Sequence, residues 1–294
     1  MTFTVDNTLP TWRKVALASW RPSDDPAITG WLEIDATSLT DYLPAVREAT
    51  GAHVTITHLV GKAAALAFAE NPACNAVVSF GRLKRRASVD VFFSVAAGSE
   101  LSGAKLEGVD EMDLADIARR LSVDVQRIRG AGDTPLQRSQ GLLKRLPGVL
   151  LKPVMRMSAF AMFDLGLDLS ELGVPLDPFG SVIVSNVGVF GIAHGFAPLI
   201  PSGRTAAILT VGSIEKRAVV VQNKIEARPM LTICGTFDHR VVDGHHLGRI
   251  QNVLRTVLED PFHHLGTPRV SSRVCSSGTS RSASEASASP PTPR

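Results

Sequence analysis

Residues 231–259 have the sequence LTICGTFDHRVVDGHHLGRIQNVLRTVLE, in which an apolar strand pattern leads through a polar turn into a helical pattern. The polar turn contains Asp238, His239, Arg240 and Asp243, the densest group of chemically active side chains in the sequence. Mixed α/β proteins usually place reactive groups where a strand leads into a helix. This junction is therefore the first candidate for a functional site.

His239 could act as a general base, because an unperturbed imidazole has a pKa of about 6.5. Asp243 could fix the loop or the ring through a hydrogen bond or an ion pair, and Gly244 would permit a tight turn into the helix. This spacing is weak on its own and leaves a structural role for His239 equally open. His245 and His246 face different ways on a helix, and no second cluster supplies a further ligand, so the sequence predicts no metal site.

A second polar pair ends an apolar strand pattern in residues 180–191, GSVIVSNVGVFG. Ser185 and Asn186 could simply satisfy backbone groups at the end of the strand. Alternatively, the Ser185 hydroxyl could donate a hydrogen bond to an oxyanion that develops during a reaction. The residues alone leave both interpretations open.

The rest of the chain alternates strand and helix patterns first and then becomes a run of strands. Strands are predicted over residues 30–35, 77–80, 89–96, 181–185, 206–211, 218–222 and 230–237, and helices over 38–51, 58–70, 113–129 and 245–259. Asn223 and Lys224 could turn a hairpin between the last two strands. This order predicts one mixed α/β domain, which we place at residues 1–266.

Two regions depart from this alternation. Residues 131–178 interleave apolar residues with Lys and Arg, which predicts one or two amphipathic helices broken by Pro147 and Pro153. These helices could pack on the domain or on a neighbouring subunit, or could contact a membrane surface or an apolar acyl chain. Residues 267–294 are rich in Ser and Pro and offer little to bury, so we expect a disordered tail.

Composition narrows the class of protein. The chain has 31 basic and 28 acidic residues, and its basic run at residues 82–86 is typical of a solvated surface rather than of a nucleic-acid interface. The three cysteines, Cys74, Cys234 and Cys275, are odd in number and widely spaced, which favours a reducing compartment. No signal-peptide pattern or bilayer-spanning apolar run is visible. We therefore expect a cytoplasmic protein without a transmembrane segment or a nucleic-acid partner.

Taken together, the two polar features resemble the catalytic domain of the dihydrolipoamide acyltransferases. These enzymes are the core component of 2-oxo acid dehydrogenase complexes and are related to chloramphenicol acetyltransferase. Residues 238–244 match the family signature D-H-R-x-x-D-G, and residues 185–188 match a strand with S-N-x-G. The resemblance covers residues 11–100 and 179–262, and implies a chloramphenicol acetyltransferase-like two-layer fold with a mixed sheet.

The resemblance also implies a mechanism. His239 would take the proton from a thiol, and the resulting thiolate would attack the carbonyl of a thioester. Ser185 would donate to the tetrahedral oxyanion, and Asp243 would hold the loop and the orientation of the histidine. In the family an arginine near the start of the domain pairs with the equivalent aspartate, and Arg13 is the candidate here. The other supporting residues are Asn186 and Gly244.

By the same resemblance we expect a homotrimer with active sites between subunits, in which Ser185 comes from the neighbour of the subunit that provides His239. Coenzyme A would be a substrate as acyl-CoA, with no bound metal. The predicted activity is acyl transfer between coenzyme A and a dihydrolipoyl-type thiol or another acceptor. The alternatives are a dehydrogenase-complex subunit that works in trans with a lipoylated protein, and a catalytically silent trimeric scaffold.

Three features depart from the family. The matching region begins by about Thr11, so we expect no lipoyl group on this chain. Residues 98–105, GSELSGAK, replace a family strand, and together with residues 131–178 they leave the substrate open. The Ser-rich tail occupies the end that relatives use for contacts between trimers, so the resemblance does not extend to a larger shell.

Overall fold

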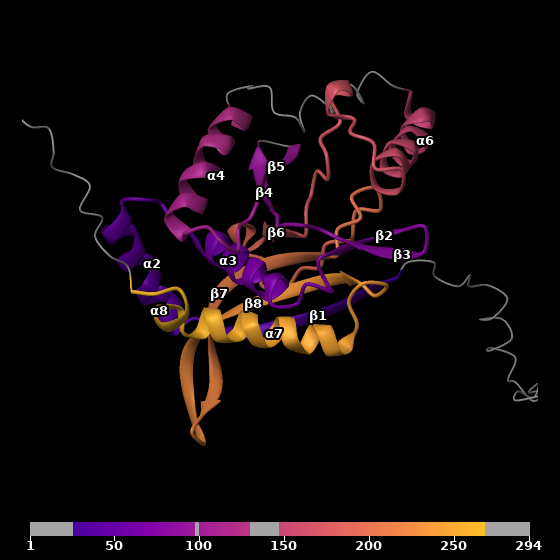
Figure 1. The fold of residues 1–294 in the computed structure, drawn as a ribbon. Helices are drawn as coiled ribbons and strands as arrows, with labels where there is room; N and C mark the ends of the chain where they lie inside the picture. Colours follow the sequence, from indigo (N-terminus) through magenta and orange to yellow (C-terminus); the bar gives the residue numbers. More distant parts are fainter. Residues whose placement is uncertain (1–25, 98–99, 130–146, 268–294) are drawn as a thin grey trace, which may run out of the picture.

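The structure is a computed structural model that describes residues 26–97, 100–129 and 147–267 (Figure 1). Its helices and strands are, in chain order, β1 (Ala27–Asp35), α2 (Thr37–Thr50), α3 (Ile56–Ala69), β2 (Ala76–Ser79), β3 (Arg82–Arg85), β4 (Val91–Ala97), β5 (Glu100–Leu106), α4 (Leu114–Arg129), α6 (Gly148–Ala159), the π-helix η1 (Phe160–Asp164), the 3-10 helix η2 (Ser170–Leu172), β6 (Val182–Asn186), the 3-10 helix η3 (Gly188–Phe190), β7 (Ala207–Val221), β8 (Lys224–Asp238), α7 (Gly244–Glu259) and α8 (Pro261–His264).

A mixed six-stranded sheet forms the centre of the fold, in the order β1-β8-β7-β6-β4-β5. Strands β4, β6 and β7 run parallel to one another, whereas β1 with β8, β7 with β8, and β4 with β5 are antiparallel. Strands β2 and β3 pair separately as a two-stranded antiparallel ribbon. The predicted mixed α/β class is therefore confirmed.

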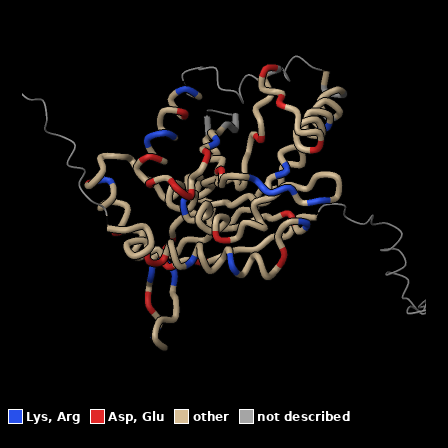
Figure 2. The backbone as a smooth tube through the Cα atoms, viewed as in Figure 1, with Lys and Arg blue, Asp and Glu red and all other residues tan. Residues whose placement is uncertain are grey.

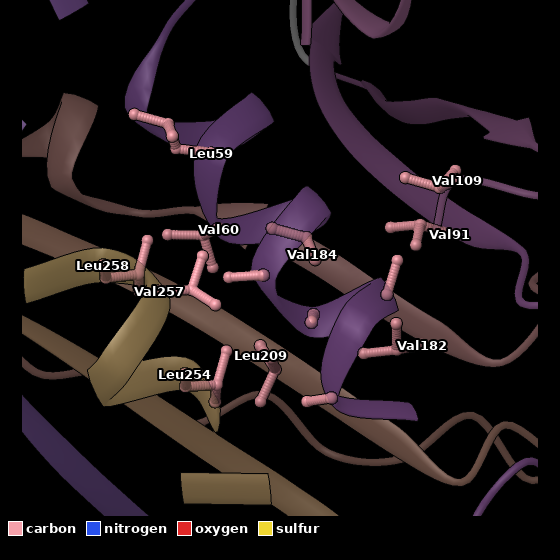
Figure 3. Close-up of a cluster of buried hydrophobic side chains, with 14 of the residues drawn as sticks. Leu59, Val60, Val91, Val109, Val182, Val184, Leu209, Leu254, Val257 and Leu258 are labelled. Atoms are coloured by element: carbon pink, nitrogen blue, oxygen red, sulfur yellow. The ribbon is translucent and has the colours of Figure 1, made fainter. Parts of the chain in front are cut away.

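Helices form a second layer on one face of the sheet. Alternate strand residues point to this layer, and Figure 3 shows side chains of α3 and α7 meeting those of β6 and β7 there. Full burial of one such aliphatic side chain stabilises the fold by about 1.5–3 kcal/mol. The labelled members are Leu59, Val60, Val91, Val109, Val182, Val184, Leu209, Leu254, Val257 and Leu258.

The opposite face of the sheet has a smaller apolar cluster. Phe92, Ile183 and Ile208 pack there against loop residues that include Leu199 and Ile200. The loop thus packs on residues of β4, β6 and β7. On β1 the alternation places Trp31 on the same face, where it is 64% exposed.

Strands β7 and β8 are longer than predicted. Residues 206–211 and 218–222 were expected as two strands, but β7 is one strand of 15 residues with a bulge between Val211 and Ile214. The polar residues between the two patterns are exposed because the outer halves of β7 and β8 project from the body as a hairpin (Figure 1). The predicted hairpin is confirmed, but its turn is made by Gln222 and Asn223, at φ values of 47° and 64°, one residue earlier than expected, and Lys224 already belongs to β8.

Two further strands were not anticipated. Residues 82–85 form β3 and are all exposed, so the expected solvated surface is confirmed for them while their strand structure was missed. Arg86 departs from this expectation, because its side chain is only 8% exposed and pairs with Asp177. Figure 2 shows basic and acidic residues interspersed elsewhere along the described backbone. Residues 100–106 form β5 and pair with β4, although their sequence departs from the family pattern.

The prediction that Pro153 breaks a helix is wrong. Helix α6 runs through Pro153 to Ala159 and continues as the π-helix η1. Pro153 is exposed, so the carbonyl that loses its helical partner there can bond to water. Pro147 does precede the helix, as its N-cap residue.

This segment packs on the body of the domain, which was one of the expected alternatives. Ala159, Met162 and Phe163 are buried in a small apolar cluster with Val77 of β2. Residues 131–146 lie outside the described residues, as do residues 268–294 of the tail predicted at 267–294. Within the described ranges, no helix is both long enough and apolar enough to cross a bilayer.

Candidate active site

The turn between β8 and α7 is fixed by an ion pair of its own. Asp238 ends β8 and is buried, with 5% of its surface exposed. Its Oδ1 accepts from Arg240 Nε at 2.9 Å, and its Oδ2 accepts from Arg240 Nη2 at 2.7 Å. The backbone N–H of Arg240 also donates to Oδ1, at 3.0 Å. Because a two-pronged contact fixes direction as well as distance, this turn is held in one conformation.

His239 lies between these two residues, with its backbone anchored and its side chain exposed. Its N–H donates to the carbonyl of Pro26 at 2.9 Å. The N–H groups of Val241 and Val242 donate to the Asp238 carbonyl, and both valine side chains are buried in the main core. The rigid turn therefore presents an exposed imidazole.

Asp243 is the N-cap residue of α7. Its Oδ1 accepts from the N–H of His246 at 3.0 Å and lies 2.8 Å from Nδ1 of the same residue. The hydrogen bond from the His246 N–H lowers the pKa of the Asp243 carboxyl. Asp243 was expected to orient His239, but within one chain its described hydrogen bonds fix the start of α7 instead.

Within one chain, neither the backbone conformation nor the surrounding space requires a glycine at position 244. It is the first residue of α7, its φ lies outside the left-handed region, and a Cβ there would meet nothing within 4 Å. Gly244 was expected to permit a tight turn into the helix, but the turn is made by residues 238–243 and Gly244 is the first helical residue.

Ser185 and Asn186 end β6, in the middle of the sheet. Asn186 Nδ2 donates to Oγ1 of Thr57 at 2.9 Å and ties the strand end to the first turn of α3. Its Oδ1 is buried and has no hydrogen-bond partner among the described residues. Gly188 follows at a point where a Cβ would collide with the backbone oxygen of Gly212. The glycine of the S-N-x-G pattern is thus required by the approach of two backbones.

A pocket of about 910 Å³ opens beside Ser185, a size within the usual range for small-molecule sites. Its walls come from the start of α3, the end of β4 and the exposed residues Val189 and Phe190. The sequence did not predict that α4 forms another wall, through residues 118–125. Contacts of this kind leave no local signal, because α4 and Ser185 are far apart in the chain.

His58 also lines this pocket and was missed as well. It is buried, and burial lowers its pKa to about 4, so its imidazole is neutral near neutral pH. Its Nδ1 accepts from the N–H of Thr55 at 3.0 Å, which completes a capping box at the start of α3. The Thr-x-x-His spacing was the available signal, although glutamate or glutamine is the usual partner.

A second cavity, of about 590 Å³, adjoins the His239 turn. Pro26, Asp238 and Arg240 form one side of it. The other described lining residues are Val78, Phe80, Asp164, Leu199, Ile200, Pro201, Arg204 and Thr205.

Ser185 and His239 do not meet within one chain. Ser185 is level with Thr210 of β7, which is level with Cys234 of β8. His239 follows Cys234 by five positions, so it lies roughly 17 Å further along the sheet and about 10 Å across it. The two groups therefore flank different cavities, and one chain alone cannot apply both of them to the same reacting atom.

The arginine and the cysteines that the sequence singled out lie apart from these two features or outside the described residues. Arg13 and Cys275 lie outside the described residues. Cys74 and Cys234 are free and buried, and burial raises the pKa of the Cys74 thiol to about 11. Within the described part of the chain, no group of three or more His, Cys, Asp or Glu side chains is arranged to hold a metal ion.

Two segments of the chain match a known protein family. The family model of the 2-oxoacid dehydrogenases acyltransferase (catalytic domain) matches residues 11–140 and 179–265 and leaves 141–178 unmatched. A similar relative is the dihydrolipoyllysine-residue succinyltransferase component of the mitochondrial 2-oxoglutarate dehydrogenase complex of Bos taurus. It is 27% identical over 202 residues, which are 68% of this chain and 35% of the relative. The lipoamide acyltransferase component of the branched-chain alpha-keto acid dehydrogenase complex of Bacillus subtilis is 24% identical, over 84% of this chain and 51% of its own length.

This chain thus spans about a third to a half of the length of these curated relatives. Among solved structures, a probable dihydrolipoamide acetyltransferase from Listeria monocytogenes has a TM-score of 0.60 at 22% identity, covering 93% of this chain and 98% of that one. The dihydrolipoamide acetyltransferase of Azotobacter vinelandii has a TM-score of 0.60 at 20% identity, covering 82% and 85%. These likenesses confirm the expected fold. The family match extends over both polar features and most of the sequence, and the chain belongs to the family of 2-oxoacid dehydrogenase acyltransferase catalytic domains.

Proposed function

We propose that this protein transfers an acyl group between coenzyme A and a thiol of the dihydrolipoyl type, with His239 as the general base. The observation that carries the proposal is the turn that holds an exposed imidazole on a fixed backbone, between Asp238 and Arg240. A base must be rigidly placed yet accessible to the substrate, and this turn meets both requirements. Curated relatives act on dihydrolipoyllysine residues, which supports the same chemistry here.

In the proposed reaction, His239 takes the proton of the attacking thiol. The thiolate adds to the thioester carbonyl, and the electron pair of the C=O bond moves onto the oxygen. Ser185 donates a hydrogen bond to this oxyanion, a contact that lowers a barrier by roughly 3–4 kcal/mol in other enzymes. Collapse of the intermediate breaks the original C–S bond, and the departing thiolate regains the proton from the imidazolium.

The distance between Ser185 and His239 supports a site shared by two copies of the chain. We propose a homotrimer in which the Ser185 pocket of one subunit faces the His239 turn of the next. The matched structure of the pyruvate dehydrogenase multienzyme complex is a cubic core, so the same fold is found in an assembly there. In this arrangement Asp243, which is exposed in the single chain, and Gly244 would lie near the interface.

The supporting residues keep the roles that the family pattern suggests. Asn186 holds the Ser185 strand end against α3, and we propose that Arg13 pairs with Asp243. In the dihydrolipoamide acetyltransferase of Azotobacter vinelandii, crystallographic and enzymatic investigations address the role of a serine, a histidine and an asparagine in the catalytic mechanism. Two of these residue types, serine and histidine, are the ones proposed here.

The proposal also covers the second substrate and the cellular compartment of the reaction. The acyl donor or acceptor other than coenzyme A would be a lipoyl group carried in trans by another protein, or a free thiol. No metal takes part in the proposed steps. We place the reaction in the cytoplasm, where the free thiols of Cys74 and Cys234 would remain reduced.

The test is thiol release from acetyl-CoA with dihydrolipoamide as acceptor. His239→Ala should lower turnover by about 10²–10⁴-fold, the usual contribution of general base catalysis. His245→Ala is the matched control, because His245 is exposed nearby on α7 and should leave turnover nearly unchanged. Equal rates in the wild type and in His239→Ala would reject the proposal. The catalytically silent trimeric scaffold would then be the remaining interpretation.

A further inference from the structure

We propose that an apolar face formed by α6 and the β2–β3 turn binds the surface of an anionic membrane, so that the protein lies on a bilayer without crossing it. This outer face consists of Leu150, Val154, Met157, Phe160 and Phe80. The helix packs on the domain through its other side, where Ala159 is buried with Met162 and Phe163. None of the described side chains of α6 lines either of the two cavities, so the inference does not depend on the proposed function.

The exposed side of α6 is apolar, which is the reverse of an ordinary surface helix. Leu150, Val154 and Met157 are four and three positions apart and therefore lie above one another on one side of the helix. They are 46%, 36% and 71% exposed, and Phe160, three positions further along, is 44% exposed. A surface helix of a globular domain normally turns its polar residues outward. This stripe therefore indicates a surface for a partner.

A second exposed aromatic ring extends the stripe from the β2–β3 turn. The rings of Phe80 and Phe160 meet edge to face, with centroids 5.8 Å apart, yet Phe80 is 65% exposed. Phe80 and Gly81 have φ values of 47° and 68°, a pair that favours asparagine or glycine over a bulky side chain. An exposed ring kept in an unfavourable backbone conformation indicates a function other than packing.

Arginine side chains border the outer face. Arg156 lies one helical turn before Phe160, on the same side of α6. Arg82 and Arg85 belong to β3, which follows the Phe80 turn. All three arginines are exposed, and within the described residues no carboxylate forms an ion pair with any of them. The face therefore offers positive charge beside apolar side chains.

The carboxylates of the same region do not cancel this charge. Asp164, at the end of η1, is already paired with Arg204. The exposed acids Asp168 and Glu171 follow in the loop beyond the helix. The local excess of positive charge is therefore available to an anion outside the chain.

Apolar side chains flanked by arginines suit the surface of an anionic bilayer. A helix that lies in such a surface buries its apolar side at the level of the headgroups, while flanking cations reach the lipid phosphates. A second copy of this chain fits less well, because a symmetric contact through the outer face would bring its unpaired arginines close to one another. The charge pattern thus favours a membrane over self-association.

The outer face is preformed, and most of it is additional to the family fold. Helix α6 and η1 belong to residues 141–178, which the family model leaves unmatched. Lys84 Nζ donates to the carbonyls of Phe163 and Asp164, at 3.1 Å each, and the Phe80 N–H donates to Asp164 Oδ1 at 3.3 Å. The helix and the ribbon are therefore held together before any partner binds.

The first experiment measures binding of the full chain to lipid vesicles by flotation. Vesicles of phosphatidylcholine with phosphatidylglycerol should bind about 10–100-fold more tightly than vesicles of phosphatidylcholine alone, because each arginine near an anionic surface strengthens binding about fivefold. Raising the salt from about 0.1 M to about 1 M should remove most of the difference. Equal binding to the two kinds of vesicle, or no binding to either, would overturn the inference.

The second experiment removes apolar side chains from the outer face. Leu150→Ser combined with Met157→Ser should weaken binding to the anionic vesicles about tenfold or more, because two side chains lose their contact with the bilayer. Val220→Ser combined with Ile225→Ser is the matched control. These two residues are 72% and 79% exposed on the β7–β8 hairpin, far from α6 (Figure 1), and should leave binding unchanged. Equal binding by both double variants would show that the outer face does not contact lipid.

The third experiment removes charge. Arg82→Gln combined with Arg85→Gln should weaken binding to the anionic vesicles about tenfold or more. Lys216→Gln combined with Lys224→Gln removes the same charge from exposed positions on the hairpin and should have little effect. Equal losses in the two double variants would mean that net charge alone attracts the protein to the vesicles, which would overturn the assigned face.

Two further measurements separate membrane binding from folding and from self-association. Phe80→Asn should leave the midpoint of denaturant unfolding close to the wild type, because asparagine accepts a positive φ, while vesicle binding falls about fivefold. Unchanged vesicle binding would remove Phe80 from the face. In light scattering without lipid, Leu150→Ser combined with Met157→Ser should have the mass of the wild type. A smaller mass would show that the outer face joins copies of the chain, and the inference would fail.

Discussion

The strand end that carries Ser185 and the turn that carries His239 are held in different ways. Ser185 follows a central strand, Asn186 is tied to α3, and Gly188 is pressed against the backbone of Gly212. The His239 turn is held by the local ion pair of Asp238 with Arg240 and leaves its imidazole exposed. The serine is thus placed by tertiary packing and the histidine by contacts within its own turn. Substitutions near Ser185 should therefore affect folding, whereas those at the His239 turn should mainly affect chemistry.

After the loss expected for His239→Ala, the largest effect should come from removing the Ser185 hydroxyl. Ser185→Ala removes the proposed oxyanion donor and should lower kcat about 10²–10³-fold, which corresponds to roughly 2.7–4 kcal/mol. Steady-state kinetics with acetyl-CoA and dihydrolipoamide would measure it. Ser94→Ala, which alters another serine of the same pocket, should stay close to the wild type. A similar loss in both variants would mean that Ser185 has no special role.

Mixing inactive variants tests whether the two regions come from different subunits. Ser185→Ala and His239→Ala chains, unfolded together at equal amounts and reassembled, should regain about one quarter of wild-type activity, because one pairing in four restores both groups. Each variant carried through the same treatment alone is the control. No recovery in trimers that have assembled would indicate that the two groups do not share a site.

Gly188→Ala should show the tertiary origin of the Ser185 position. The new Cβ would collide with the Gly212 backbone oxygen, and the two backbones would have to separate, at a cost of about 1–3 kcal/mol in the free energy of unfolding. Denaturant unfolding monitored by circular dichroism would measure the loss. An unchanged midpoint would mean that the contact is easily relieved.

The pH dependence of stability should report His58, in the Ser185 pocket. Its pKa is about 4 in the folded protein and about 6.5 when unfolded, so the neutral form stabilises the fold above pH 6.5 and this contribution falls as the pH drops toward 4. Relative to His58→Gln, which keeps a capping-box partner, the wild type should lose about 2 kcal/mol between pH 7.5 and 5. Denaturant unfolding at several pH values would measure it. Wild-type and His58→Gln stabilities that change in parallel with pH would contradict this assignment.

The smallest effect should be at Gly244 in the His239 turn. Gly244→Ala has open space around it in one chain, and the free energy of unfolding should change by less than about 1 kcal/mol. If a neighbouring subunit approaches this residue, the same variant should weaken assembly or activity. Unfolding and light scattering on one sample would separate the two effects.

Local patterns allowed much of this fold to be predicted from the sequence. The strand, turn and helix around His239 follow from hydrophobic periodicity, and the predicted helix at 113–129 is α4. Periodicity failed where exposure removes alternation, as at Glu215, Lys216 and Arg217, three successive charged residues that lie inside β7 but interrupt the two strand patterns. It also failed at Pro153, where an exposed helix surface tolerates the missing hydrogen bond.

The site was predictable only in part, for a related reason. His239 and Ser185 were found because each lies in a short motif, but their separation depends on strand register, which neither motif encodes. The pairing of Asp164 with Arg204 joins positions that are 40 residues apart, and the α4 wall of the Ser185 pocket joins positions further apart still. Such contacts are set by tertiary packing rather than by neighbouring residues.

The contact between Gly188 and Gly212 has a mechanical consequence. Gly212 lies in the bulge at the base of the projecting β7–β8 hairpin. Its backbone oxygen approaches Gly188 so closely that no side chain fits between them. The two backbones are so close that one cannot move toward the other without a clash. A partner that binds the tip of the hairpin and tilts it would therefore displace Gly188, and with it the strand end that carries Ser185.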